Sequence, residues 1–155
     1  NVRLSAIFGP WEYDTGLRDT LSAPMQASLL AIAGSTAILS RKESRDWTYS
    51  RHVAEALYAL MDQKNLTHDL YNITSGMPWS VEEWCKCLAK TFPEFQYRFA
   101  RAGEQTNVDL FGDRDRVTMS SEKLTSDTGY EFSKNIPEIY KNFEDWIMSS
   151  REFWK

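Results

Sequence analysis

The sequence predicts an α/β fold with a parallel sheet component. Two short apolar runs, residues 2–8 and 70–74, are typical of buried strands, and helical segments separate them along the chain. Parallel strands need crossover connections of this kind and neighbours on both sides. Two such strands are too few for a stable sheet. We therefore expect residues 1–155 to form a single partial domain whose missing strands come from sequence before residue 1.

The first strand, residues 2–8, ends at Gly9-Pro10, a pair that stops a strand and turns the chain. Polar and aromatic residues then predict a loop over residues 11–21. Ser22 is a suitable N-cap for a helix over about residues 23–33, which has a proline in its first turn and a glycine beyond its end.

Two further strands, residues 36–39 and 45–49, flank a basic tip at residues 40–44. This pattern fits either a hairpin or two strands joined by a loop. Ser50 is expected to cap the next helix. The apolar residues of that helix recur at helical spacing and are Val53, Ala54, Leu57, Leu60 and Met61.

A strand at residues 70–74 is followed by a helix that Ser80 and Glu83 open as a capping box. The apolar residues of this helix are Val81, Trp84, Leu88 and Ala89. Together these segments predict a strand-loop-helix unit.

Residues 95–99 and 107–111 alternate apolar and polar side chains, which predicts two partly exposed strands. A short helix starts at Ser120 or Ser121 and stops at Gly129. Pro137 opens the last helix. Its apolar stripe is the clearest in the chain and consists of Ile139, Tyr140, Phe143, Trp146 and Ile147.

Composition excludes several classes of protein. The chain is 42% hydrophobic and 26% charged, which is typical of a globular domain, and it has no apolar run long enough for a membrane span. Its net charge of −4 gives no general attraction to nucleic acid or to an anionic membrane surface. Cys85 and Cys87 point in opposite directions on a helix and cannot pair with each other. A reduced, cytoplasmic setting fits best.

The seven glycines are never closer than seven residues apart. Neither the dinucleotide-binding loop G-x-G-x-x-G, nor the P-loop, nor the G-x-S-x-G nucleophile elbow can be written with them. His52 and His68 are the only histidines and form no metal-binding motif, so no metal site is predicted.

Tyr130 and Lys134 have the Y-x-x-x-K spacing with which a lysine on a helix lowers the pKa of a catalytic tyrosine. Here the five residues lie between the end of one helix and the start of the next. We therefore interpret Tyr130 as a packing aromatic and Lys134 as a solvated cation, and we predict no catalytic residue in this chain.

Arg45 and Arg101 are candidates for binding an anion. Each lies beside a turn, and Arg101 precedes Gly103, where the backbone can approach a ligand closely. A guanidinium group can bind two phosphate oxygens at once, which suits a diphosphate. The alternative is that both arginines pair with neighbouring carboxylates such as Asp46 and Glu104.

Five segments, in this order, resemble motifs of the C-terminal half of the NAD-dependent epimerases/dehydratases, an extended short-chain dehydrogenase/reductase family that includes UDP-glucose 4-epimerase. Residues 3–10 are similar to the family's R-x-x-N-v-y-G-P strand, and residues 45–49 to its R-D-[FYW]-x-[HY] strand. The other three are residues 71–76 (y-N-i-g-x-G), residues 101–104 (R-x-G-[DE]) and residues 123–130 (K-x-x-x-x-x-G-[YW]). Together the motifs span nearly the whole chain.

The resemblance implies that Arg45 and Arg101 hold the diphosphate of a nucleotide-sugar substrate and that Glu104 accepts a ribose hydroxyl. It implies a fold made of two strands of a Rossmann-type parallel sheet and a small mixed substrate-binding subdomain. Arg51 and His52 stand where the family has an acidic pair, a departure that bears on the substrate class.

The strand that ends at Gly9 and Pro10 would pass under the nicotinamide and the substrate. Ser5 and Ala6 would then lie at the substrate, and Ile7 beside the cofactor. Ala6 stands where the family usually has a substrate-binding asparagine.

The family's cofactor loop and catalytic tyrosine and lysine precede the strand that begins here at Val2. The resemblance thus implies that this chain alone binds no NAD or NADP and that the parent protein does so as a homodimer. We expect the chain to be the substrate-binding portion of an NAD-dependent sugar-nucleotide epimerase or dehydratase. The alternatives are a stand-alone nucleotide-sugar binding module without catalysis and a family member that acts on a non-nucleotide substrate.

Overall fold

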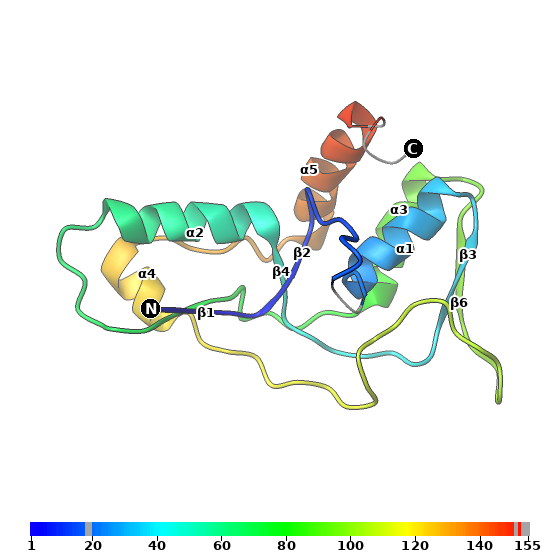
Figure 1. The fold of residues 1–155 in the computed structure, drawn as a ribbon, viewed down its shortest axis with the longest axis horizontal. Coiled ribbons are helices and arrows are strands. Elements are labelled where there is room, and N and C mark those ends of the chain that lie inside the picture. Colours follow the sequence, from blue (N-terminus) through cyan, green and yellow to red (C-terminus); the bar gives the residue numbers. More distant parts are fainter. Residues whose placement is uncertain (18–19, 151, 153–155) are drawn as a thin grey trace.

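The computed structural model describes residues 1–17, 20–150 and 152, which form three pairs of parallel strands and five α-helices (Figure 1). The parallel pairing confirms the α/β prediction. Residues 18 and 19 of the expected loop lie outside the described residues. In chain order the elements are β1 (Val2–Leu4), β2 (Ala6–Phe8), α1 (Ala23–Ile32), β3 (Thr36–Leu39), β4 (Trp47–Tyr49), α2 (Ser50–Asp62), β5 (Tyr71–Ile73), α3 (Val81–Thr91), β6 (Gln96–Phe99), α4 (Glu122–Thr128) and α5 (Ile136–Ser149).

The strand expected over residues 2–8 is divided at Ser5. On one side of Ser5, β1 pairs with β5, and on the other side β2 pairs with β4. The Ser5 amide still donates to the carbonyl of Ile73 (3.3 Å), so the chain leaves one neighbour and joins the next at this residue. The third pair joins β3 to β6. The hairpin alternative for residues 36–49 is therefore wrong, because β3 and β4 pair with different strands.

The strand expected over residues 107–111 is also wrong. Val108 and Leu110 are buried, as the alternation predicts, but side chains rather than a regular ladder satisfy the backbone around them. Asn107 accepts a hydrogen bond from the amide of Ile38 (2.7 Å) and donates one to the carbonyl of Thr36 (2.9 Å). The segment is consequently a loop that packs apolar side chains inward.

Helix ends follow the sequence signals in most places. Ser22 accepts a hydrogen bond from the Met25 amide (3.3 Å) at the start of α1, and Ser80 and Glu83 form the predicted capping box of α3. Ser50 does not cap α2, since it is the first residue of that helix and its hydroxyl faces the carbonyl of Pro10 (3.5 Å). The buried face of α2 is Val53, Ala56 and Leu60, whereas the expected Ala54 and Met61 are exposed.

Two apolar clusters hold the fold together. The larger one lies among α1, α3, α5, β2 and β4 and is centred on Trp84, whose ring meets Phe8 at 5.0 Å and Phe143 at 5.1 Å. All five residues of the predicted α5 stripe are buried in it. The smaller cluster lies among α2, α4 and β5. Figure 1 shows α2 and α4 at the left of the molecule and α1 and α3 at the right, with β2, β4 and α5 between them.

Strand β1 is not covered by either cluster. All three of its residues are exposed, including the apolar Val2 (43%) and Leu4 (47%), and among the described residues its only strand partner is β5. No helix within the described part of the chain is both long and apolar enough to span a bilayer.

Candidate functional site

A pocket of about 550 Å³ lies along β2 and the turn that follows it. It is lined by six residues singled out from the sequence: Ser5, Ala6, Ile7, Gly9, Pro10 and Arg45. Arg45 reaches the pocket from the segment before β4, and β2 and β4 are hydrogen-bonded neighbours. The sheet pairing therefore brings together residues that lie about forty positions apart in the sequence.

Gly9 sets the shape of the turn that closes this pocket. Its φ is +127°, a backbone conformation that residues with a side chain rarely adopt. A Cβ at this position would lie 2.8 Å from the Ser50 hydroxyl oxygen and 2.8 Å from the ring of Tyr49. The chain can thus pass closely over the start of α2 only because residue 9 has no side chain.

Arg45 is buried, with 7% of the residue exposed. Its Nη2 donates to the carbonyl oxygens of Leu110 and Phe111, each at 3.2 Å. The guanidinium carbon lies 5.1 Å from the ring centre of Trp47 and 5.4 Å from that of Phe111. The side chain is thus held by two peptide carbonyls and two aromatic rings.

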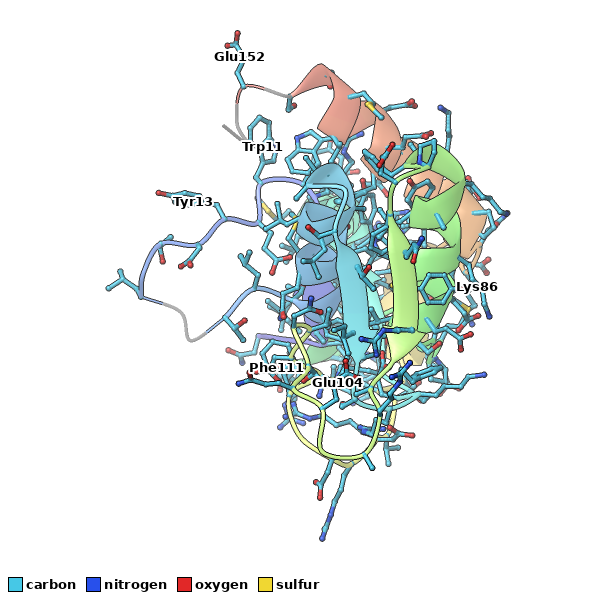
Figure 2. All side chains as sticks on the ribbon, turned by 90° about the vertical axis from the view of Figure 1, so that its right-hand side faces the viewer. Trp11, Tyr13, Lys86, Glu104, Phe111 and Glu152 are labelled. Carbon is cyan, nitrogen blue, oxygen red and sulfur yellow. The ribbon has the colours of Figure 1, made fainter. Side chains whose placement is uncertain are left out.

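Phe111 has a positive φ of 58°, uncommon for a residue other than glycine. In this conformation its ring lies over Arg45 and lines the pocket. Figure 2 shows Phe111 at the lower end of the molecule, on the loop that follows β6.

No carboxylate neutralises Arg45 directly: it forms no salt bridge with an aspartate or glutamate of the described chain. Burial, followed by the nearby positive charge of Arg116, lowers the pKa of Arg45, although the carboxylates of Glu43 and Asp109 act in the opposite direction without forming a salt bridge to it. A buried cation with no carboxylate in contact is costly, and it is a suitable partner for an anionic ligand.

Next to Arg45, the carboxylate of Asp46 is buried in a cluster of hydroxyl groups. It accepts hydrogen bonds from Ser75 (2.9 Å), from Thr74 and, at longer range, from Thr48 (3.4 Å). The Thr48 hydroxyl in turn lies 2.6 Å from that of Ser5. The cluster therefore joins the β1–β2 junction, β4 and the end of β5 at the point where the strand pairs diverge.

Arg101 and Glu104 do not line this pocket. They lie on the turn after β6, and Figure 2 places Glu104 at the same lower end of the molecule as Phe111. Glu104 forms a two-pronged salt bridge with Arg98 (2.5 and 2.7 Å) and also accepts the Arg101 amide (2.9 Å). The Arg98 guanidinium is the main cause that lowers the pKa of Glu104 to about 2. Arg101 is exposed.

The Y-x-x-x-K residues lie in the connection between α4 and α5, as expected. The Tyr130 hydroxyl donates to Glu55 (2.8 Å), and its ring meets that of Phe132 at 5.0 Å. Burial and then the hydrogen bond to Glu55 raise the pKa of Tyr130, which is the opposite of what a tyrosinate base needs. Tyr130 is thus a packing residue with a satisfied hydroxyl, and Lys134 is exposed.

The described ranges offer neither a metal-binding group of side chains nor a reactive thiol. Residues 1–17, 20–150 and 152 contain no group of three histidine, cysteine or acidic residues placed to hold a metal ion. Cys85 and Cys87 are free and buried, and burial raises the pKa of both thiols.

Phe111 and Arg116 were not predicted to be near Arg45. Both lie on the long loop between β6 and α4, where the alternation of residues 107–111 predicts a strand and residues 112–121 have no periodic pattern. Arg116 lines a second pocket, of about 290 Å³, together with Arg45 and residues 4–6. The only sequence signal for such a role is a local one, the alternating charges of residues 113–116.

No family model and no curated protein matches the chain. Solved structures do match it. Epimerase Mth375 from Methanothermobacter thermautotrophicus is 20% identical over 99% of this chain and 44% of that protein, with a TM-score of 0.72. ADP-L-glycero-D-manno-heptose-6-epimerase from Helicobacter pylori is 19% identical over 96% of this chain and 43% of that protein (TM-score 0.73). UDP-glucose 4-epimerase from Thermotoga maritima, solved with UDP-glucose, is 17% identical over 97% and 46% (TM-score 0.70).

Other structures with this fold contain NAD or NADPH. The chain spans less than half the length of each of the three epimerases and aligns with them over almost all of its own length. The described residues thus have the fold of the C-terminal portion of epimerases of the extended short-chain dehydrogenase/reductase type.

Proposed function

We propose that this chain is the substrate-binding portion of an NAD-dependent sugar-nucleotide epimerase or dehydratase. The observation that carries the proposal is Arg45, a buried cation without a carboxylate partner at the wall of a 550 Å³ pocket. In a structural neighbour that contains UDP-glucose, the ligand has the diphosphate that such a site would favour.

In this proposal Arg45 binds the diphosphate, and the sugar lies along Ser5 and Ala6. Ile7, Gly9 and Pro10 form the wall on the cofactor side of the pocket. The two carbonyls bind only Nη2 of Arg45, and the rings of Trp47 and Phe111 contact the guanidinium without using its N–H groups, so the remaining N–H groups are available to phosphoryl oxygens. Arg101 and Glu104, on a separate turn, are the further contacts that the motif resemblance predicts.

The residues present here do not fit a complete dinucleotide site. The glycines are too far apart to form the loop that cradles a pyrophosphate, and the Tyr130 hydroxyl is bound to Glu55. We therefore assign to this chain the binding and orientation of the substrate, and assign NAD or NADP binding and the redox step to the rest of the parent protein.

The open edge of β1 supports a partner within the parent protein. A two-stranded parallel pair is too small to be stable by itself, and Val2 and Leu4 are exposed on it. We propose that an N-terminal Rossmann half adds its strands to this edge, which would bury both side chains. A cytoplasmic location, suggested by the two free cysteines, and a homodimeric parent are further parts of the proposal.

The test is titration of UDP into the full-length protein, measured by isothermal titration calorimetry. Replacing Arg45 by methionine keeps an apolar stem beside the rings and removes the charged fork. We expect Arg45→Met to weaken UDP binding by about tenfold or more, since hydrogen bonds between charged groups contribute roughly 1.5–3 kcal/mol. Arg45→Lys should fall between wild type and Arg45→Met.

Arg101→Ala tests the motif-based assignment of the exposed arginine, for which we expect a smaller loss. Arg114→Ala removes an exposed arginine that lines neither pocket; it is the charge-matched control and should bind UDP like wild type. UDP affinity that is unchanged in Arg45→Met would contradict the sugar-nucleotide assignment and favour a non-nucleotide substrate.

A further inference from the structure

A second guanidinium group lies near Arg45, and it is that of Arg116. Both line the 290 Å³ pocket formed with residues 4–6, Asp46 and Met119. Residues 4–6 and Arg45 also line the larger pocket, so the two cavities are contiguous around Arg45. The positive charge of Arg116 is close enough to Arg45 to lower its pKa.

The loop holds Arg116 in this place through its neighbour. Asp115 accepts a hydrogen bond from the Arg41 guanidinium (2.5 Å) and another from the amide of Ser44 (3.0 Å). The residue before Arg116 is thereby fixed to the residue before Arg45. Asp115 is used in neutralising Arg41, and within the described chain Arg116 forms no salt bridge.

The carboxylate of Asp46 also lines this pocket, but it does not form a salt bridge with Arg45 or Arg116. Its oxygens are already bound by the hydroxyls of Thr48, Thr74 and Ser75. The pocket therefore holds two guanidinium groups and one carboxylate that is hydrogen-bonded to three hydroxyl groups and forms no salt bridge with either guanidinium.

We propose that Arg116 is the second anion-binding residue of the site, and that Arg45 and Arg116 together bind the two phosphoryl groups of a nucleoside diphosphate. The inference rests on the proposed function, and it adds a contact that neither the motif resemblance nor the spacing of residues indicates. Two adjacent cations repel each other until an anion lies between them, and a diphosphate provides two or more charges in one group.

The loop provides a matched control. Arg114 lies two residues before Arg116, is likewise exposed, and lines neither pocket. Arg114→Ala and Arg116→Ala change the net charge of the same loop by the same amount, so they separate a specific contact from a general field. Arg116→Lys keeps the charge without the fork.

The experiment is calorimetric titration of UDP and of UMP into the full-length wild type and these variants at one ionic strength. We expect Arg116→Ala to weaken UDP binding by about tenfold and UMP binding by less, because a single phosphate needs only one of the two arginines. Arg116→Lys should lose part of the UDP affinity. Arg114→Ala should bind both ligands within about twofold of wild type.

Two results would overturn the inference: equal losses in Arg114→Ala and Arg116→Ala, or UDP affinity unchanged in Arg116→Ala. In either case a loss in Arg45→Met would leave the proposed function standing. Absence of UDP binding in the wild type would instead remove the proposed function. Titration of inorganic pyrophosphate would then test whether Arg45 and Arg116 form a diphosphate site at all. The proposed site is retained only if Arg116→Ala weakens pyrophosphate binding more than Arg114→Ala does.

A further variant tests whether Asp115 positions Arg116, and its melting temperature checks that the protein is still folded. Asp115→Asn leaves Arg116 unchanged but weakens the hydrogen bonds that join residue 115 to Arg41 and Ser44. We expect it to lower UDP affinity less than Arg116→Ala, with the melting temperature of both variants near that of wild type because residues 115 and 116 are exposed. UDP affinity in Asp115→Asn equal to wild type would remove the positioning role of Asp115.

Discussion

Arg45 and Arg101 lie in two regions of opposite construction, although the motif resemblance assigns both to one diphosphate. The Arg45 region is buried: its glycine is crowded, its arginine lacks a carboxylate, and its carboxylate, Asp46, is bound by hydroxyls. The turn after β6 is exposed, and its carboxylate, Glu104, is paired with Arg98. A buried unpaired charge points to a ligand far more strongly than an exposed arginine beside a glycine does.

The largest expected difference between the regions is in their carboxylates. Asp46→Ala removes the acceptor of three buried hydroxyls at the meeting point of the strand pairs, and we expect it to lower the free energy of unfolding by about 3 kcal/mol. Glu104→Ala breaks an exposed ion pair and should leave stability close to that of wild type. Urea unfolding followed by tryptophan fluorescence measures both. Similar losses of stability in the two variants would contradict this difference between the buried and the exposed region.

The two glycines give a smaller difference in the same direction. Gly9→Ala places a Cβ against Ser50 and Tyr49 at a φ of +127°, and we expect a loss of about 3 kcal/mol. Gly103 has a φ of +76° and open space around the position of a Cβ, so Gly103→Ala should cost only backbone strain, about 1 kcal/mol. Thermal unfolding of the two variants side by side checks the order, which a larger effect at Gly103 would reverse.

The smallest effects are in the pH dependence of stability, where two carboxyl groups have opposite signs. Burial raises the pKa of Glu43 above 4.5, so its favourable contribution is complete below pH 4.5 and is lost as the pH rises through the raised value. Arg98 lowers the pKa of Glu104 to about 2, so its contribution is present above pH 4.5 and is lost as the pH falls toward 2.

Unfolding measurements from pH 3 to pH 8 on Glu43→Gln and Glu104→Gln separate the two effects. Relative to wild type, Glu43→Gln should gain stability as the pH rises above 4.5, since glutamine can still accept the Val81 amide. The deficit of Glu104→Gln should shrink as the pH falls. High salt should weaken the second effect more than the first, because an exposed ion pair is screened. A Glu43→Gln curve parallel to wild type would contradict the first sign.

The sequence predicted local structure well where one segment contains the whole cause. The capping box of α3 and the apolar stripe of α5 are examples, because their residues contact each other or one shared core. It did not predict the division of the first strand at Ser5, since that depends on which strands lie beside it. Residues 107–111 have the alternation of a strand, but the side chain of Asn107 takes the place of ladder hydrogen bonds.

The residues of the candidate site likewise divide into those that local sequence predicted and those that depend on tertiary structure. The residues on β2 and before β4 were found because each lies within a short motif, and the parallel pairing brings them together. Phe111 was missed because the alternation of residues 107–111 predicts a strand and not a loop beside Arg45. Arg116 was missed because nothing in the irregular residues that follow indicates which strand they will cross. Phe111 reaches Arg45 through a positive φ that phenylalanine seldom adopts, a conformation that tertiary contacts rather than local sequence must fix.

The hold of two peptide carbonyls and two rings on Arg45 also bears on the thermodynamics of recognition. A free arginine gives up much of its rotamer entropy when it closes on an anion, whereas this one is already held by two hydrogen bonds and two ring contacts within the fold. Binding of an anion to Arg45 therefore costs little side-chain conformational entropy. The protein has met that cost during folding, and the same rigidity limits the geometries of anion that it can accept.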